Sequence, residues 1–304
     1  MHAQKRKLHS LESIVALCAL FAVLAVSVGV AQAGSPSSKR RSSANDFEDP
    51  RYGEPGKLTL RSAVALVQDA TTGEVVLAKN SETAVPIASI TKLMTAMVVL
   101  DARLDLEKEI TITHQDSDFR KGTQSRLRDG AVLTRDDLLL LALMSSENRA
   151  AAALGRSYPG GLDAFVQAMN TKALAIGMKN SKFVDPTGLS SDNVASGQDL
   201  ARMVRAAHDY ALIREYSTRD KAYVRSRGKT LAFHNTNGLL RSPKWEIGLS
   251  KTGYISEAGR CLVMRVRVAS KDLIVVLLDS WGKYSRVGDA QRIRKWLETS
   301  ITAG

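Results

Sequence analysis

Apolar runs of strand length lie at both ends of the region that follows residue 57. Near its start, Ala63 to Val67 and Val75 to Leu77 flank Thr71-Thr72-Gly73, a pattern typical of a β-hairpin. Near its end, the runs that predict strands are Ile247 to Ile255, Cys261 to Ala269 and Leu273 to Leu278. The spacing of apolar residues from Val287 to Ile301 predicts an amphipathic helix that closes the chain.

The stretch between these strands shows mostly helical patterns. Ile90 to Leu100 is apolar, lacks Gly and Pro, and is too long for a typical strand, so it predicts a buried helix with Ala88 and Ser89 near its first turn. Three further segments have helical spacing: Leu138 to Met144, Leu162 to Ile176 and Gln198 to Ala211. The order predicts a mixed α/β (α+β) fold, in which distant parts of the chain complete one antiparallel sheet flanked by helices, beside a mostly helical region.

The N-terminus has the pattern of an export signal. Lys5 to Lys7 is positive, Ile14 to Val30 is apolar, and Ala31 to Ala33 supplies a small-residue cleavage site. We therefore expect residues 1–33 to be a signal peptide cleaved after Ala33, and the protein to be periplasmic. An uncleaved membrane anchor is the alternative, because 17 apolar residues approach the lower limit for a span. Residues 34–57, rich in Ser, Pro and charge, predict a flexible leader before a domain over residues 58–304.

The charge of the chain narrows the choice of partner. It has 43 Lys and Arg against 31 Asp and Glu, a formal net charge of +12. In an exported protein this suits wall peptides rich in carboxylates, and also peripheral association with the wall or an acidic membrane surface. Nucleic acid is not an expected partner, because the protein is exported and its cations form no block of five or six.

Neither a disulfide nor a metal site is expected. Only Cys261 follows the signal segment, so an intrachain disulfide has no second cysteine, and its apolar strand marks it as core rather than a nucleophile. His114, His208 and His234 are the histidines that follow that segment, and the sequence contains no H-E-x-x-H. No metal and no other cofactor is predicted.

Ser89-Ile90-Thr91-Lys92 is the first pattern that bears on chemistry. Residues three apart share a helix face, so the Ser89 hydroxyl and the Lys92 amine are expected to touch. A serine needs a base, and a buried lysine acts as one when desolvation or a second cation lowers its pKa. S-x-x-K also occurs at Ser226 and Ser280, but those copies contain Gly and border strand-like segments, whereas the Ser89 copy opens a long apolar helix.

Ser146-Glu147-Asn148 follows the apolar run that ends at Met144. A second hydroxyl relays protons toward a leaving amine, and an Asn side chain both accepts from and donates to a substrate amide. The rival copy, Ser191-Asp192-Asn193, lies in a turn-rich region where such residues are common loop formers. A plain polar helix end is the alternative interpretation of the Ser146 copy.

Lys251-Thr252-Gly253 is the third pattern and the only K-T-G in the chain. Lysine holds a carboxylate and depresses the pKa of a neighbouring amine, threonine hydrogen-bonds the same carboxylate, and glycine permits close backbone approach. An edge strand blunted by a lysine is the alternative. Only the Ser89 copy of S-x-x-K precedes both an S-x-N and the K-T-G, which is the motif set of β-lactamases and penicillin-binding proteins.

On these motifs the chain resembles the low-molecular-mass penicillin-binding proteins of the D-Ala-D-Ala peptidase family. It is especially similar to the D-alanyl-D-alanine endopeptidases, the penicillin-binding protein seven type. The likeness spans nearly the whole mature chain, and its matching stretches include Pro86 to Leu104, Leu138 to Ala153, Pro186 to Leu189 and Lys251 to Cys261. Val85 departs from the family, where an arginine is common at that position.

The resemblance implies a β-lactamase/transpeptidase-like fold and a role for each site residue. Ser89 would be acylated, Lys92 would be its base, and Ser146 would pass the proton to the leaving group. Asn148 would bind the substrate backbone, and Lys251 with Thr252 its carboxylate, beside Gly253. The N–H groups of Ser89 and Tyr254 would form the oxyanion hole. Peptidoglycan crosslinks would be the substrate, and β-lactam antibiotics would inhibit.

Each alternative function has a sequence feature that distinguishes it from an endopeptidase. A class A β-lactamase needs an additional Glu base, and the segment Lys182 to Leu189 offers Asp185 and no E-x-x-x-N. A D-Ala-D-Ala carboxypeptidase that trims pentapeptide stems is closer, but the stretch after Gly253 is expected to be too short for the second β-domain and membrane helix of such relatives. A non-enzymatic wall-binding or penicillin-sensing protein would tolerate loss of Ser89 or Lys92, and both are present.

Overall fold

The computed structural model describes residues 58–118 and 121–302, all within one compact unit, Ser42–Gly304. The expected signal peptide and leader lie outside the described residues. Within the described part of the chain, no helix combines the length and the apolar character needed to cross a membrane.

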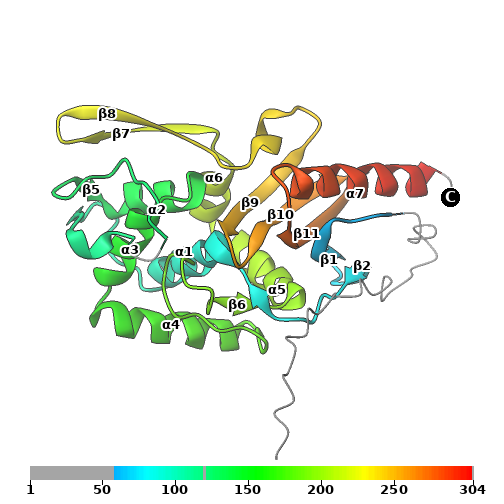
Figure 1. Ribbon diagram of the computed structural model, residues 1–304, viewed down its shortest axis with the longest axis horizontal. Coiled ribbons are helices and arrows are strands. Elements are labelled where there is room, and N and C mark those ends of the chain that lie inside the picture. Colours follow the sequence, from blue (N-terminus) through cyan, green and yellow to red (C-terminus); the bar gives the residue numbers. More distant parts are fainter. Residues whose placement is uncertain (1–57, 119–120, 303–304) are drawn as a thin grey trace, which may run out of the picture. The chain divides into compact units, whose positions relative to one another are not determined.

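Five strands form one antiparallel sheet in the order β2-β1-β11-β10-β9 (Figure 1). The strands are β1 (Ser62–Asp69), β2 (Val75–Lys79), β9 (Glu246–Ile255), β10 (Gly259–Val268) and β11 (Lys271–Ser280). The expected hairpin and the three expected C-terminal strands are therefore confirmed, with bounds within three residues of the apolar runs. The first strand of the chain pairs with the last, so distant segments complete the sheet as the order of elements predicted.

Helices cover both faces of the sheet because its strands are apolar on both sides. On one face Leu66, Val263 and Val276 pack in the same core as α5 (Gly197–His208). On the other face α7 (Ser285–Thr302) buries Ile293 and Leu297 against the sheet. The alternation of side chains along a strand separates the two cores.

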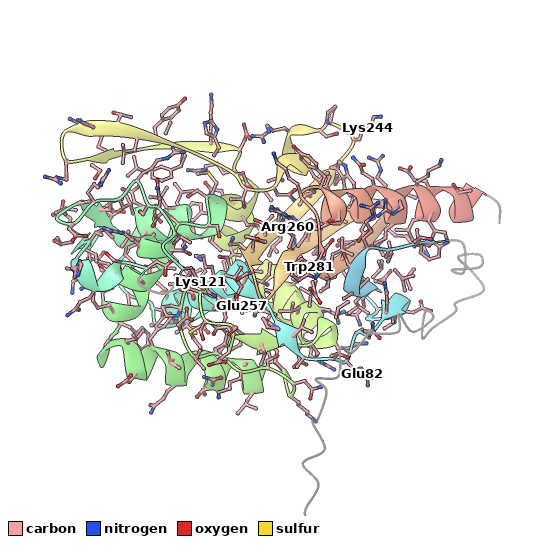
Figure 2. All side chains as sticks on the ribbon, in the orientation of Figure 1. Glu82, Lys121, Lys244, Glu257, Arg260 and Trp281 are labelled. Carbon is pink, nitrogen blue, oxygen red and sulfur yellow. The ribbon has the colours of Figure 1, made fainter. Side chains whose placement is uncertain are left out.

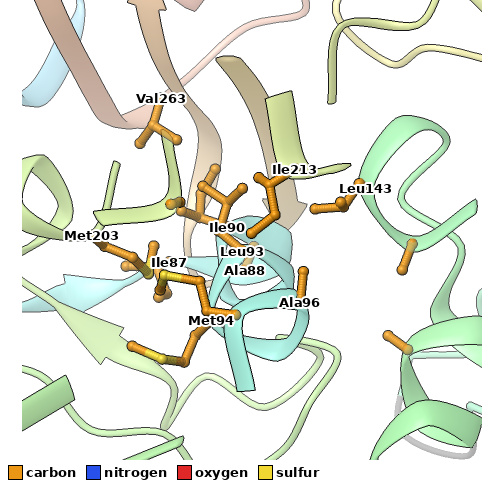
Figure 3. Packing of buried hydrophobic residues seen from close by; sticks show 14 of the residues in the cluster. Ile87, Ala88, Ile90, Leu93, Met94, Ala96, Leu143, Met203, Ile213 and Val263 are labelled. Carbon is orange, nitrogen blue, oxygen red and sulfur yellow. The ribbon is translucent and has the colours of Figure 1, made fainter. Parts of the chain in front are cut away.

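The mostly helical region lies beside the sheet edge formed by β9. Its helices are η3 (Ala88–Ile90), α1 (Thr91–Asp101), η4 (His114–Asp116), α2 (Arg135–Met144), α3 (Asn148–Arg156), α4 (Gly161–Ala175) and α6 (Ala211–Thr218). α1 is buried on all sides: Figure 3 shows Leu93, Met94 and Ala96 enclosed by Met203 of α5, Ile213 of α6 and Val263 of the sheet. A helix that is apolar around its whole circumference requires such enclosure.

Two parts of the central region differ from the sequence-based expectation. The helix expected from Gln198 to Ala211 ends at His208, and α6 begins separately at Ala211. Residues 221–234 lie in the stretch expected to be mostly helical, but they form the hairpin β7 (Lys221–Ser226) and β8 (Lys229–His234), which agrees with the strand-like segments noted beside Ser226. Ala222 and Val224 are buried in a period of two. The remaining short elements are β3 (Val85–Pro86), β4 (Glu109–Thr111), β5 (Val132–Thr134), β6 (Val194–Ala195) and η5 (Gly238–Arg241).

Candidate active site

Ser89 and Lys92 meet at the start of the buried helix. Ser89 lies in the 3-10 turn η3, and Lys92 is the second residue of α1, so one helical turn separates them. Lys92 Nζ lies 2.9 Å from Ser89 Oγ. Ala88, directly before the serine, adopts φ +47°, an unusual backbone for a residue with a side chain. The turn holds the half-buried hydroxyl at a fixed place beside the amine.

Three oxygen atoms surround the amine of Lys92, and Ser89 Oγ is one of them. Nζ donates to Asn148 Oδ1 at 2.7 Å and to the Thr187 carbonyl at 2.6 Å. A neutral amine has two N–H groups and one lone pair. In this neutral form the lone pair faces the Ser89 hydroxyl, whereas the charged form donates to Ser89 Oγ as well.

Burial lowers the pKa of Lys92 to about 7, although its charge is favoured by Asp185, Glu147 and Asp118. The side chain is fully buried. The sequence had suggested that the positive charge of Lys251 would contribute to this shift. In the structure, desolvation is the cause, and the carboxylates oppose it.

Ser146 and Asn148 lie on the tight connection between two helices. α2 ends at Met144, Ser146 takes φ +60°, and Glu147 caps α3 by accepting from the Ala150 N–H at 2.8 Å. Asn148 is thus the first residue of α3, and its Nδ2 donates to Thr123 Oγ1 at 3.0 Å. The short turn directs the hydroxyl of Ser146 and the amide of Asn148 to the same cleft.

Lys251 approaches the cleft from the sheet. Its Nζ donates to Ser146 Oγ at 2.8 Å and to the Thr252 carbonyl at 3.0 Å. Burial lowers the pKa of Lys251 well below its usual value, and the charges of Lys92 and Arg286 lower it further. Thr252 Oγ1 donates to Thr236 Oγ1 at 2.6 Å. The K-T-G strand therefore faces the two serines with a second buried amine and a pair of hydroxyls.

Two glycines let other segments reach the backbone of the nucleophile. A Cβ on Gly253 would lie 2.9 Å from the Ile87 carbonyl oxygen and 3.1 Å from the Ser89 nitrogen. A Cβ on Gly188 would lie 2.0 Å from the Ala88 carbonyl oxygen, and Gly188 also has φ +79°. Gly253 was singled out in the sequence for close approach; Gly188 was noted only as part of a matching stretch.

Asp185 organises the loop that carries Thr187 and Gly188. Its carboxylate accepts hydrogen bonds from Thr187 N at 2.6 Å, Gly188 N at 2.8 Å and Ser190 N at 3.0 Å. Burial would raise the pKa of Asp185, but the hydrogen bonds from Thr187, Ser190 and Gly188 hold it below its usual value. Sequence reasoning considered Asp185 only as a deacylation base; an Asp two residues before Thr-Gly is also a signal for such a turn.

The other copies of the motifs, and Cys261, have structural positions outside the candidate site. Asn193 of the rival S-x-N is fully buried and donates to Asp185 Oδ2 at 2.7 Å, so it supports the loop. Ser226 and Lys229 are opposite residues of the β7–β8 hairpin, and Ser280 is buried in β11. Cys261 is fully buried, and burial raises the pKa of its thiol to about 12, as expected for a core residue.

The rim of the cleft carries further charge and aromatic surface. Lys121 pairs with Glu257 of the turn between β9 and β10, and Figure 2 shows the two side by side. Tyr254 is exposed, with the Arg260 guanidinium 4.6 Å from its ring centre. Arg286, which the sequence did not single out, adds positive charge near Lys251. A cavity of about 450 Å³ borders Asn148, Asp185 and Thr187.

Comparison with known proteins identifies close relatives. Residues 51–282 match the family described as D-alanyl-D-alanine carboxypeptidase. A D-alanyl-D-alanine endopeptidase of Pseudomonas aeruginosa is 46% identical over 95% of this chain and 90% of its own length. A D-alanyl-D-alanine endopeptidase of Escherichia coli is 46% identical over 79% of this chain and 78% of its own length. The crystal structure of a Streptomyces DD-transpeptidase superposes with a TM-score of 0.73 and 28% identity, over 79% of this chain and 98% of that one.

Proposed function

Because the chain belongs to the D-alanyl-D-alanine carboxypeptidase family of serine peptidases, we propose that it is a D,D-endopeptidase acting on peptidoglycan. It would hydrolyse the bond between a D-alanyl carbonyl and the diaminopimelyl amine of a second stem, through an acyl-enzyme on Ser89. The observation that carries the proposal is the buried amine of Lys92, which lies 2.9 Å from Ser89 Oγ and has two further acceptors, Asn148 Oδ1 and the Thr187 carbonyl.

Acylation begins when Lys92 takes the proton of the Ser89 hydroxyl. The oxygen of Ser89 then attacks the D-alanyl carbonyl, and the N–H groups of Ser89 and Tyr254 stabilise the negative oxygen that forms. The proton on Lys92 passes through Ser146 to the leaving amine as the C–N bond breaks, which leaves an ester on Ser89 and a neutral Lys92. Water then attacks this ester with Lys92 again as base. The OH group of the water stays on the acyl group, and the other proton of the water passes through Lys92 to the Ser89 oxygen as the ester bond breaks.

Substrate binding uses the polar groups around this centre. The Asn148 side chain would bind the substrate backbone, and Lys251 with Thr252 would bind the carboxylate on the leaving side. A bound carboxylate opposes the repulsion that lowers the pKa of Lys251, so binding there favours the charged form of the amine. Arg286 adds to the same positive field.

The chemistry of a direct crosslink fits this pocket. The amine that is released belongs to the D-centre of a diamino acid, which also bears a carboxylate. The leaving group therefore resembles a terminal D-amino acid with a larger side chain, which Lys251 and Thr252 would hold in the same way. Two relatives at 46% identity that are named endopeptidases support this choice. The family description, in contrast, supports the alternative, a carboxypeptidase that trims pentapeptide stems.

Location and inhibition follow from the same proposal. A peptidase acting on wall crosslinks works outside the cytoplasm, which agrees with the expected cleavage of a signal peptide after Ala33 and a periplasmic mature protein. β-Lactam antibiotics would acylate Ser89 and remain bound as a stable ester. The basic surface would favour peripheral association with the wall.

Digestion of defined muropeptides tests the proposal. The purified protein is incubated with a crosslinked muropeptide dimer and, separately, with a monomeric pentapeptide, and products are identified by mass. We expect a higher kcat/KM for cleavage of the dimer than for release of terminal D-Ala. Efficient trimming of the pentapeptide with survival of the dimer would make the protein a carboxypeptidase.

A further inference from the structure

A basic groove lies between the β7–β8 hairpin and the segment Gln124–Arg128. It has a volume of about 720 Å³. Its lining contains four cationic side chains and no acidic one: Arg126, Arg128, Arg227 and Lys229, together with Gln124, Ser125, Ser226 and Leu231. Residues 221–234, the whole hairpin, hold four Lys and Arg and no Asp or Glu. A concave surface lined by one sign of charge concentrates ligands of the opposite sign.

Two of the arginines that line the groove contact its opposite wall, and the other two cationic side chains are exposed to solvent. Arg126 donates to the Ala232 carbonyl and stacks over Phe233, which ties the segment to β8. Arg227 lies at the hairpin tip, and its Nη1 is 3.5 Å from the Asp129 carbonyl oxygen. Among the described residues, the side chains of Arg128 and Lys229 have no hydrogen-bond or carboxylate partner, and both are exposed.

One wall of the groove contacts the candidate site directly, and the other leads to it along β8. One wall begins next to Thr123, whose hydroxyl accepts from Asn148, and Ser125 in that wall donates to Glu147. The other wall is the tip of the hairpin, where Leu231 of β8 is the lining residue nearest in sequence to Thr236, which hydrogen-bonds Thr252. Leu231 lies five residues before Thr236, a span of at most about 18 Å, so the remainder of a peptide stem held at Lys251 and Thr252 is long enough to reach the groove.

We propose that this groove is a binding site for the carboxylate-bearing peptide of the leaving strand. The inference rests on the proposed endopeptidase function: beyond the carboxylate held by Lys251 and Thr252, the rest of the second stem extends toward Arg128 and Lys229. A small substrate such as penicillin ends at the pocket and does not reach the groove. A flat anionic membrane is a poorer match to a concave site beside the catalytic cleft than an acidic peptide is.

Two double variants, each replacing two cationic residues with neutral glutamine, test the proposal. Arg128→Gln with Lys229→Gln removes two charges from the groove, and Lys179→Gln with Lys295→Gln removes two exposed charges elsewhere. For each protein, kcat/KM on the crosslinked dimer and the rate of penicillin acylation are measured at low and high salt. Removing the groove charges should lower dimer cleavage about 10-fold at low salt, less at high salt, with penicillin acylation as in the wild type. The control pair should leave both rates as they are.

The other outcomes contradict the proposal in different ways. Unchanged dimer cleavage by the groove variant, or an equal fall in both rates, would overturn it. Weaker binding to vesicles of anionic lipid, with dimer cleavage unchanged, would assign the groove to a membrane instead. Failure of the wild-type protein to cleave dimers would overturn the proposed function as well, whereas normal cleavage by the groove variant overturns only this inference.

Discussion

Two Ser–Lys pairs face each other across the cleft, and they differ in their electrostatic surroundings. On the helical side, Lys92 lies beside Ser89, and carboxylates near it partly offset the cost of its burial. On the sheet side, Lys251 lies beside Ser146, where the charges that act on it are positive. Both amines are buried and both hydrogen-bond a serine, so geometry alone does not distinguish them.

The difference assigns separate tasks to the two lysines. Lys92 has a pKa of about 7 and two fixed N–H acceptors, which suits an amine that gains and loses a proton during catalysis. Lys251 lacks a carboxylate among the charges that shift its pKa, and a bound substrate carboxylate would supply one. This difference supports the proposal that the helical pair transfers protons and that the sheet pair binds an anion.

Arginine at each position should separate proton transfer from anion binding most strongly. Arginine keeps a positive charge but does not lose its proton, so Lys92→Arg should lower acylation of Ser89 by about 10³-fold. Lys251→Arg retains a cation for the carboxylate and should lower it only about 10-fold to 10²-fold. Labelled penicillin and mass spectrometry of the adduct measure both. Equal losses in the two variants would remove the distinction between the lysines.

Crowding the backbone of the helical pair should have the next largest effect. Gly188→Ala places a Cβ against the Ala88 carbonyl at a positive φ, and should lower the unfolding free energy by about 2–5 kcal/mol. Displacement of Ser89 should also lower acylation about 10²-fold.

Gly130→Ala is the matched control, because it has φ +78° and nothing within 4 Å of the new Cβ. It should lower the unfolding free energy by about 1–2 kcal/mol and leave acylation intact. Denaturant unfolding and acylation rates report the two effects. Similar behaviour of the two variants would mean that Gly188 does not position the nucleophile.

Removal of the carboxylate beside Lys92 should produce the smallest change, but one with a definite sign. Asp185 favours the charged form of Lys92, so Asp185→Asn should lower the pKa of that amine further. The pH at which acylation reaches half its maximum should then move to lower values, while weaker hydrogen bonds reduce stability by about 1–3 kcal/mol. The pH–rate profile distinguishes this from a structural effect alone, because a purely structural loss lowers the plateau without moving the midpoint toward acid.

The elements that carry the motifs were predictable from the sequence, because each has a strong local pattern. The apolar segment after Ser89 is too long for a typical strand and therefore predicts a helix, which the structure contains as α1. The strand around Lys251 likewise lies where its pattern places it, and Ser146 follows a helix that ends at Met144 as predicted. Order along the chain selected Ser89 over Ser226 and Ser280, and the structure places only Ser89 beside a buried lysine among these three.

Features that depend on tertiary contact were not predictable. The separation of α5 from α6 and the β7–β8 hairpin arise in segments whose weak patterns do not choose between helix and strand. The contribution of Asp185, Glu147 and Asp118 to the pKa of Lys92 joins segments far apart in the chain. The approach of Gly188 to within 2.0 Å of the Ala88 carbonyl, measured from an added Cβ, has the same long-range origin.

The pH dependence of Ser89 acylation tests the central claim most directly. The wild-type protein is treated with labelled penicillin across the neutral range, the initial rate is measured, and the adduct is mapped, with Ser89→Ala as the unlabelled control. Because the proposed base is the neutral form of Lys92 and its pKa is about 7, the rate should fall as pH drops through about 7, with all label on Ser89. A rate that stays constant from well below to well above that pH, or label that persists in Ser89→Ala, would contradict the assignment of Lys92 and Ser89.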